Sequence, residues 1–281
     1  MAGQATALNG GHVSGFGATK RTDNWLKGPI LTVLGLATFL VYSTWAAFQG
    51  EHYFVDPYLS PMYSPVLFTV EGVAGGAPLH HAWFGVWPDW LNNFFPSFMP
   101  KSPAFLILVF PGLFRFTCYY YRKAYYRSFV GTPPGCAVGP IRQKKYRGET
   151  ALLIFQNLHR YALYMGIVFI VILTYDAIIS FSRNGELGIG VGSIIITMNA
   201  CLLACYTFGC HSWRHIIGGK LNCFSCDSPS RFRHGAWKKS SWLNARHMHF
   251  AWISLFWVMF TDFYIRMVSM GIFTDFNTWG N

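Results

Sequence analysis

The fold is decided by one long apolar run, LLIFQNLHRYALYMGIVFIVILTYDAIISF, at residues 152–181. A bilayer core about 30 Å thick needs about 20 mainly apolar residues in a helix, because unpaired backbone groups cannot be left in hydrocarbon. Four more runs meet that requirement, at residues 29–48, 104–121, 189–213 and 250–272. The sequence therefore predicts an all-α integral membrane protein, built as a bundle of five transmembrane helices.

The composition supports a membrane protein and argues against a nucleic-acid-binding one. Of the 281 residues, 52% are hydrophobic, 19% aromatic and only 12% charged, which is not the composition of an ordinary soluble domain. The net charge of +11 could indicate a nucleic-acid partner. Basic residues beside membrane spans account for that charge, so we expect lipid and no nucleic acid as partner.

The basic residues also predict the orientation of the chain. They gather before the first span, between the second and third, and between the fourth and fifth, at Lys20, Arg21, Lys27, Arg122, Lys123, Arg127, Arg142, Lys144, Lys145, Arg147, Arg214, Lys220, Arg231, Arg233, Lys238, Lys239 and Arg246. The other side carries only Lys101 and Arg183. The positive-inside rule then places the N-terminus in the cytoplasm and the C-terminus outside the cell membrane.

This topology divides the chain into three parts. Residues 1–28 form a polar cytoplasmic N-terminal segment, and residues 29–272 form the transmembrane domain. That domain contains an outer loop at 50–102 and cytoplasmic loops at 122–151 and 214–246. Residues 273–281 form an outer C-terminal tail.

The seven cysteines lie in predicted spans or cytoplasmic loops, and none lies in an outer loop. A disulfide framework is therefore not expected, and we interpret the cysteines as reduced thiols or ligands. Cys223 and Cys226 form a lone CxxC pair, which is half of a zinc knuckle without a second pair at suitable spacing. A loop that packs on a soluble partner is the favoured interpretation of this pair.

Four predicted spans each offer a Cys or His close to the cytoplasmic boundary. Cys118, His159, Cys210 and His249 all lie within roughly two turns of it, about 5–10 Å deep. Singly, a buried Cys is usually a small hydrophobe, and a His near a helix end usually satisfies a backbone group. Together they indicate a cofactor, because polar groups in a bilayer are costly. Two thiolates with two imidazoles suit zinc or a Rieske-type [2Fe–2S] centre, and imidazoles alone suit bis-histidine haem b.

Two segments resemble a known family. The run Gln156-Asn157-Leu158-His159-Arg160-Tyr161 looks like the Asn/Ser-x-His-Arg helix entry of complex II membrane anchors. The run GCHSWRH at residues 209–215, with Gly218-Gly219 and NARHMH at residues 244–249, resembles the single-subunit SdhC-type anchor of haem-less actinobacterial succinate dehydrogenase. The similarity covers roughly residues 152–270.

The resemblance implies an anchor that holds a Rieske-type [2Fe–2S] cluster inside the membrane and reduces quinone in the respiratory chain. Carried onto this sequence, it puts Cys118 and Cys210 on one iron and His159 and His249 on the other, with Cys205, His211 and His215 as reserves. Soluble Rieske domains use two Cys-x-His-like loops, which are absent here, so the ligands would come from separate helices. The chain has no flavin fingerprint and no ferredoxin-type Cys run, so a flavoprotein and a soluble iron–sulfur subunit are the implied partners.

Two other functions stay open at this point. Histidine boxes of a di-iron membrane desaturase or hydroxylase could be formed by His211 and His215 with His247 and His249, joined by His159 and His234. A di-haem b anchor could use His159, His211, His215 and His249, but would leave the cysteines unexplained.

The outer halves of the spans carry a second set of polar residues. Asp176 and Arg266 fall in the same leaflet, where a salt bridge between them would relieve two costly charges. Tyr264, with His81 and Trp83 from the outer loop, is then the predicted quinone pocket.

Overall fold

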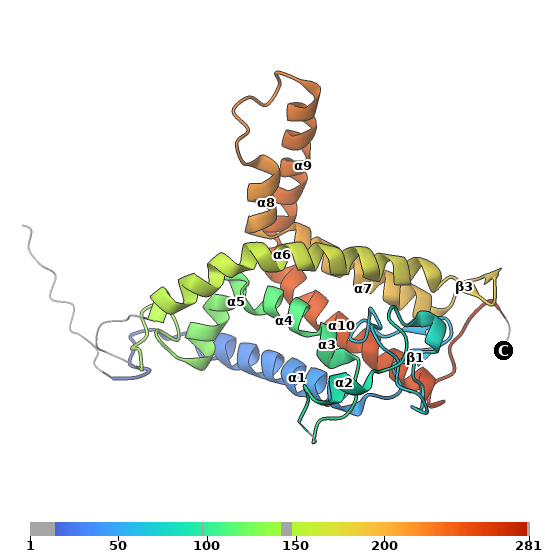
Figure 1. Ribbon diagram of the computed structural model, residues 1–281. Coiled ribbons are helices and arrows are strands. Elements are labelled where there is room, and N and C mark those ends of the chain that lie inside the picture. The colour runs from blue at the N-terminus through green and yellow to red at the C-terminus, as the bar shows by residue number, and fades with distance from the viewer. Residues whose placement is uncertain (1–14, 97, 142–147, 280–281) are drawn as a thin grey trace, which may run out of the picture.

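The computed structural model describes residues 15–96, 98–141 and 148–279. Within these residues, four helices are long and apolar enough to cross a membrane: α1 (Lys27–Gln49), α6 (Gly148–Ile179), α7 (Val191–Phe208) and α10 (His247–Ser269). They run along the long axis of the molecule, with α10 packed on α1 and α7, and α6 packed on α7 (Figure 1). The predicted class of a mainly helical, multi-pass membrane protein is thereby confirmed.

The second predicted span, residues 104–121, is a chain of short helices. It consists of α3 (Ala104–Ile107), α4 (Val109–Phe116) and α5 (Tyr119–Ala124), continued by the π-helical turn η2 (Tyr125–Phe129). Pro111 explains the first break, because its ring would clash with the carbonyl of residue 107 in a continuous helix. The segment still packs along α6 through α4, and the count of five spans stays a prediction.

Cys118 marks the second break in this segment. Its backbone is extended, with φ −61° and ψ 131°, and α5 begins directly after it. The hydroxyl of Thr117 donates to the Leu113 carbonyl at 2.8 Å, which closes the end of α4. The Cys118 side chain therefore projects from an extended residue between two helices and not from the face of a helix.

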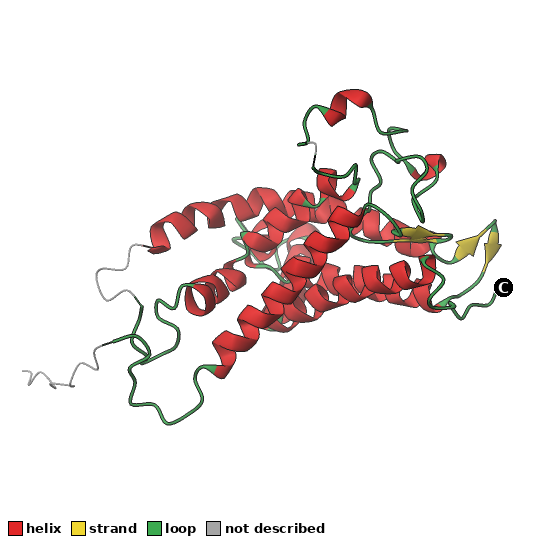
Figure 2. Cartoon of the chain, turned by 90° about the horizontal axis from the view of Figure 1, so that it is seen from below, coloured by secondary structure: helices red, strands yellow, loops and turns green. Residues whose placement is uncertain are grey.

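Irregular structure gathers at the end of the bundle that holds the C-terminus (Figure 2). Two antiparallel pairs lie there, β1 (Phe54–Val55) with β2 (Tyr58–Leu59) and β3 (Ser182–Arg183) with β4 (Glu186–Leu187). The loop at 50–102 also contains the 3-10 turn η1 (Leu79–His81) and α2 (Asp89–Asn92). Its rings of Tyr53 and Tyr63 are fully buried and stack 4.2 Å apart, which fixes the loop over the ends of α1 and α10.

The predicted loop at 214–246 is largely helical. It contains most of α8 (His211–Gly218) and all of α9 (Ser228–Ala245), which form a hairpin that stands off the bundle, across the direction of the long helices (Figure 1). The Asp227 carboxylate caps α9 by accepting from the Ser230 N–H at 2.6 Å. Cys223 and Cys226 are joined by a disulfide in the turn of the hairpin, which corrects their interpretation as reduced thiols or ligands.

Candidate metal centre

A buried cluster lies near the start of α10, where four segments of the chain meet. Its members come from the α4–α5 segment, α6, the α7–α8 junction and α10. Three predicted ligands are buried there: Cys118 is 2% exposed, Cys210 1% and His159 6%. The Phe114 ring stacks on His159 at 4.7 Å, which joins this imidazole to the cluster that contains both thiols.

Cys210 lies at a break between two helices, as Cys118 does. The glycine before it, Gly209, packs so closely on α9 that a β-carbon would lie 3.2 Å from Leu243. Cys210 is the extended N-cap residue of α8, and its Sγ accepts the Trp213 N–H at 3.2 Å. This hydrogen bond fixes the position of the Cys210 sulfur at the beginning of α8.

His247, rather than the predicted His249, faces the Cys118 thiol. Its Nε2 lies 3.5 Å from the Cys118 Sγ, and its ring stacks on Tyr206 at 4.9 Å. His249 is exposed. Two residues along a helix are separated by about 200° of rotation, so only one of the pair can face inward. The signal that could have identified His247 is its spacing of four residues to Ala251, which is fully buried in the same cluster.

The hydrogen bonds of the two imidazoles leave ring nitrogens available. The Thr117 Oγ1 lies 3.0 Å from His159 Nδ1 and already donates its hydrogen to Leu113, so Nδ1 carries the proton and Nε2 is free to bind a metal. The Nδ1 atom of His247 is buried and has no hydrogen-bond partner among the described residues. An unsatisfied buried nitrogen of this kind costs about 1–3 kcal/mol.

Arg115, which is not among the predicted site residues, places a positive charge beside the cluster. Its guanidinium donates to the Tyr121 hydroxyl at 3.0 Å, the Ala251 carbonyl at 2.9 Å and the Ser254 hydroxyl at 3.1 Å. The same group lies 4.6 Å from the centre of the Tyr206 ring. No carboxylate pairs with it in the part of the chain that the structure covers. Its position inside the apolar run at 104–121 was the available signal.

The reserve ligands and the alternative histidine sets lie elsewhere. Cys205 is partly buried on α7, while His211 and His215 are exposed on α8, where Arg160 lies 3.3 Å from His215 Nδ1. His234 lies on the α8–α9 hairpin, stacked on Phe224 at 4.5 Å. The structure therefore does not assemble the residues of the histidine boxes or of the bis-haem arrangement around one site.

Among residues 15–96, 98–141 and 148–279, no three side chains of His, Cys, Asp or Glu are close enough to hold a single metal ion. A Rieske-type [2Fe–2S] centre takes thiolates on one iron and imidazoles on the other. Cys118, Cys210, His159 and His247, which lie in or against one buried cluster, are side chains of these two kinds.

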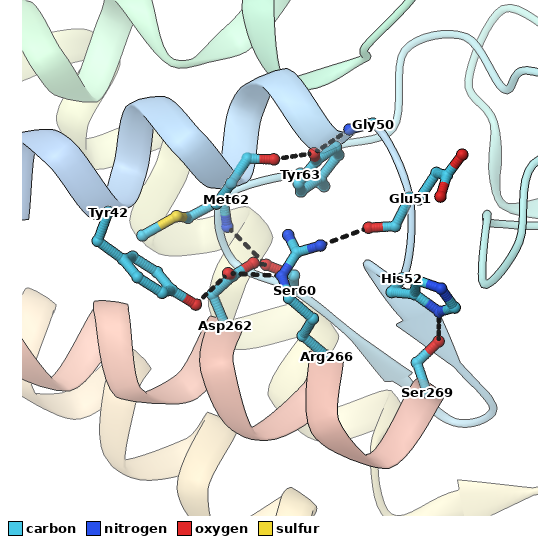
Figure 3. A network of polar contacts seen from close by, with 11 residues as sticks. Tyr42, Gly50, Glu51, His52, Ser60, Met62, Tyr63, Asp262, Arg266 and Ser269 are labelled. Atoms are coloured by element: carbon cyan, nitrogen blue, oxygen red, sulfur yellow. Dashed lines mark hydrogen bonds and ion pairs between the residues drawn. The ribbon is translucent and has the colours of Figure 1, made fainter. Parts of the chain in front are cut away.

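A second polar network lies at the opposite end of the bundle (Figure 3). Asp262 and Arg266 are both fully buried, with the Arg266 Nε 3.5 Å from the carboxylate. The Asp262 carboxylate accepts hydrogen bonds from the hydroxyls of Tyr42 and Ser60, and the guanidinium donates to the Glu51 carbonyl at 2.6 Å. The predicted salt bridge between Asp176 and Arg266 is therefore wrong. Asp262 is one turn away on the same helix, and Asp176 accepts a hydrogen bond from Ser64 instead.

The residues predicted to bind quinone also lie at this end, each with different partners. Tyr264 donates to Asp275 at 2.6 Å, and Tyr58 donates to the same carboxylate at 2.7 Å. A cavity of about 230 Å³ lies next to Tyr58 and Asp275. His81 stacks on Phe54 at 4.7 Å, and burial together with the neighbouring His80 lowers the pKa of His81. Trp83 is 58% exposed.

Comparison with known proteins identifies the family. The family model of the actinobacterial succinate dehydrogenase subunit SdhC matches residues 27–271. A chain of the Mycobacterium smegmatis Sdh1 complex in the apo form has a similar structure, with a TM-score of 0.80 and 42% identity over 94% of each chain. No curated protein matches the sequence. The chain therefore belongs to the SdhC family of membrane subunits of actinobacterial succinate dehydrogenase, as its resemblance at residues 152–270 implied.

Proposed function

We propose that this SdhC chain is the quinone-reducing anchor of its complex, and that Cys118, Cys210, His159 and His247 hold a Rieske-type [2Fe–2S] centre. When bound, such a centre supplies one-electron transfer between the soluble iron–sulfur subunit and quinone. The observation that carries the proposal is the meeting of two thiols and two imidazoles from separate segments in one buried cluster. His247 takes the place that the sequence assigned to His249.

The residues around the four ligands have roles that can be read from their contacts. Thr117 orients His159 and fixes its tautomer, so that Nε2 faces the site. Coordination of His247 through Nδ1 would relieve the cost of that unpartnered nitrogen. Phe114 and Tyr206, whose rings lie 5.6 Å apart, pack on the two imidazoles and exclude water from them.

The proposed orientation places the end with the basic loops in the cytoplasm. That end carries the start of α10, the α8–α9 hairpin and the candidate metal centre. The soluble iron–sulfur subunit and the flavoprotein would dock there, because both are water-soluble and the thiol cluster lies close to this boundary. The support for these partners is membership of the SdhC family and the similarity to a chain of an Sdh complex.

Replacing His247 by Ala tests this function. We expect the purified complex to lose quinone reduction while it retains succinate oxidation with a soluble dye, because the dye takes electrons from the soluble subunits. His249→Ala is the matched control, since His249 is exposed on the same helix, and it should behave like wild type. Retained quinone reduction in the His247 variant would remove this residue from the electron path.

For quinone, we propose a pocket at the end of the bundle with the loop 50–102, formed by Tyr264, His81 and Trp83. Tyr264 donates to the Asp275 carboxylate, which lines the cavity, so the two residues form a proton route to it. Tyr264 lies 17 residues beyond His247, a helical rise of about 25 Å.

Changing Tyr264 to Phe and His81 to Ala should raise the quinone KM or lower kcat without altering the EPR spectrum of the metal centre. The rate of electron tunnelling falls steeply with distance. The competing location for quinone is therefore the cytoplasmic rim near Trp213, which lies closer to the proposed metal centre. Wild-type kinetics in both variants, or quinone seen at that rim, would contradict the distant pocket.

A further inference from the structure

The hairpin formed by α8 and α9 is the feature that neither the metal centre nor the quinone pocket uses; we call it the lateral arm, residues 211–245. It begins at His211, after Gly209 and Cys210 at the end of α7, and ends at Ala245, two residues before α10 starts. Both of its ends therefore lie at the same boundary of two membrane-spanning helices. Figure 1 shows that the arm stands off the bundle, across the direction of those helices, so it runs along the plane of the membrane.

Specific contacts hold the arm in this direction. At its base, the Ser240 hydroxyl donates to the Phe208 carbonyl at 2.8 Å, and the Asn244 side chain donates to the Gly209 carbonyl at 2.8 Å. Farther out, Trp237 packs so closely on Gly218 that a β-carbon there would lie 2.5 Å from the indole. The Arg233 guanidinium donates to two carbonyls at the end of α8, those of residues 217 and 219. These contacts hold α8 against α9, and α9 is about 27 Å long.

These contacts use one face of α9 and leave the other uncovered. Positions 233, 237, 240 and 244 recur at helical spacing on the inner face. The outer face carries Arg231, Phe232, Lys238, Lys239 and Trp242, all exposed, with Phe232 78% and Trp242 55% exposed. Arg246 lies 4.0 Å from the centre of the Trp242 ring. Basic and aromatic side chains on one face are typical of helices at the level of lipid headgroups.

We propose that the lateral arm lies on the membrane surface and binds anionic phospholipid headgroups through Arg231, Lys238 and Lys239, with Phe232 and Trp242 inserted among the headgroups. The charge balance supports an anionic ligand, because residues 211–246 contain seven Lys and Arg and one acidic residue, Asp227. The direction of the arm supports lipid rather than the soluble subunits. It extends sideways over the bilayer, whereas those subunits would meet the end of the bundle.

Native mass spectrometry of the purified complex, titrated with phosphatidylglycerol, tests the charges. The variant Arg231→Gln/Lys238→Gln/Lys239→Gln should bind this lipid roughly a hundredfold more weakly, at about fivefold for each charge removed. Titration with phosphatidylcholine should show no difference. The control variant Lys20→Gln/Lys27→Gln/Lys123→Gln removes the same number of positive charges from exposed positions outside the arm. It should retain most of the affinity for phosphatidylglycerol. Equal losses in both variants, or no loss in either, would overturn the proposal.

A photo-crosslinker at the most exposed aromatic position tests the location without removing a charge. We expect Phe232→benzoylphenylalanine, irradiated in native membranes, to become attached to phospholipid. Attachment to another protein subunit would show that the arm is a protein-docking element and would overturn the proposal. This second experiment does not depend on assembly of the triple variant.

Discussion

His247 and His249 show which properties of a single residue can be predicted from sequence: its depth along a helix can, but the direction that it faces cannot. Depth along a helix follows from counting residues, so the sequence could place a Cys or His of four spans near one boundary. The rotation of α10 depends on which side chains pack inside, above all Ala251, and this is a tertiary property. The same limit hid Arg115, whose hydrogen bonds to Ala251 and Ser254 require two helices to meet.

Arg115 is expected to raise the midpoint potential of the proposed [2Fe–2S] centre. The centre gains one negative charge on reduction, and a fixed positive charge nearby favours the reduced form. At a separation on the order of 10 Å and an effective dielectric constant of about 20, the effect is about 1–2 kcal/mol. Arg115→Gln should therefore lower the potential in an EPR-monitored redox titration by on the order of 60 mV.

Two further variants separate charge from hydrogen bonding at this position. Arg115→Lys keeps the charge and should remain near the wild-type potential, while Ser254→Ala removes one hydrogen bond of Arg115 and leaves the charge in place. A shift as large in the Lys variant as in the Gln variant would show that the charge is not the cause.

At the scale of elements, hydropathy found the long helices and missed their interruptions. An average over 18 or more residues is insensitive to a single extended residue, so the breaks at Cys118 and Cys210 within predicted spans were not foreseen. Helix α9 was predicted as a loop because it is polar and contains no long apolar stripe. It becomes a stable helix through Trp237 against Gly218 and through its contacts with the end of α7.

The buried ion pair on α10, whose two members also form hydrogen bonds with the loop at 50–102, gives a prediction about stability. Arg266→Met leaves the Asp262 charge buried without its partner, and we expect a loss of about 3–5 kcal/mol, seen as a lower Tm of the purified complex. The double variant Asp262→Leu/Arg266→Met should regain most of that loss. The exposed pair of Asp56 and Arg183 is the control, and Arg183→Gln should change stability by less than about 1 kcal/mol. A double variant less stable than the single one would contradict this account.

At the scale of the whole molecule, membrane insertion and sidedness follow from composition and charge, whereas docking depends on surfaces shared with other chains. The basic residues Lys144, Lys145 and Arg147 were predicted to dock the soluble subunits, and they lie outside the described residues. Reversing all three to Glu should reduce co-purification of the iron–sulfur protein and the flavoprotein. In wild type, the assembly should weaken as salt rises, because exposed charges are screened over about 8 Å at physiological ionic strength.

The control for docking is charge reversal at the other end of the bundle, at Lys101 and Arg183, which should leave assembly intact. Assembly that is indifferent both to the triple reversal and to salt would count against the basic end as the docking surface.

The proposed metal centre is tested by the EPR spectrum of the dithionite-reduced complex, compared among wild type, Cys118→Ser, His247→Ala and His249→Ala. The proposed ligand set predicts a rhombic signal with a mean g value below that of the free electron, in addition to the signals of the soluble subunits. That signal should be lost in the first two variants and kept in the third. A Soret band in the visible spectrum without this signal, or a signal that survives in Cys118→Ser and His247→Ala, would contradict the account.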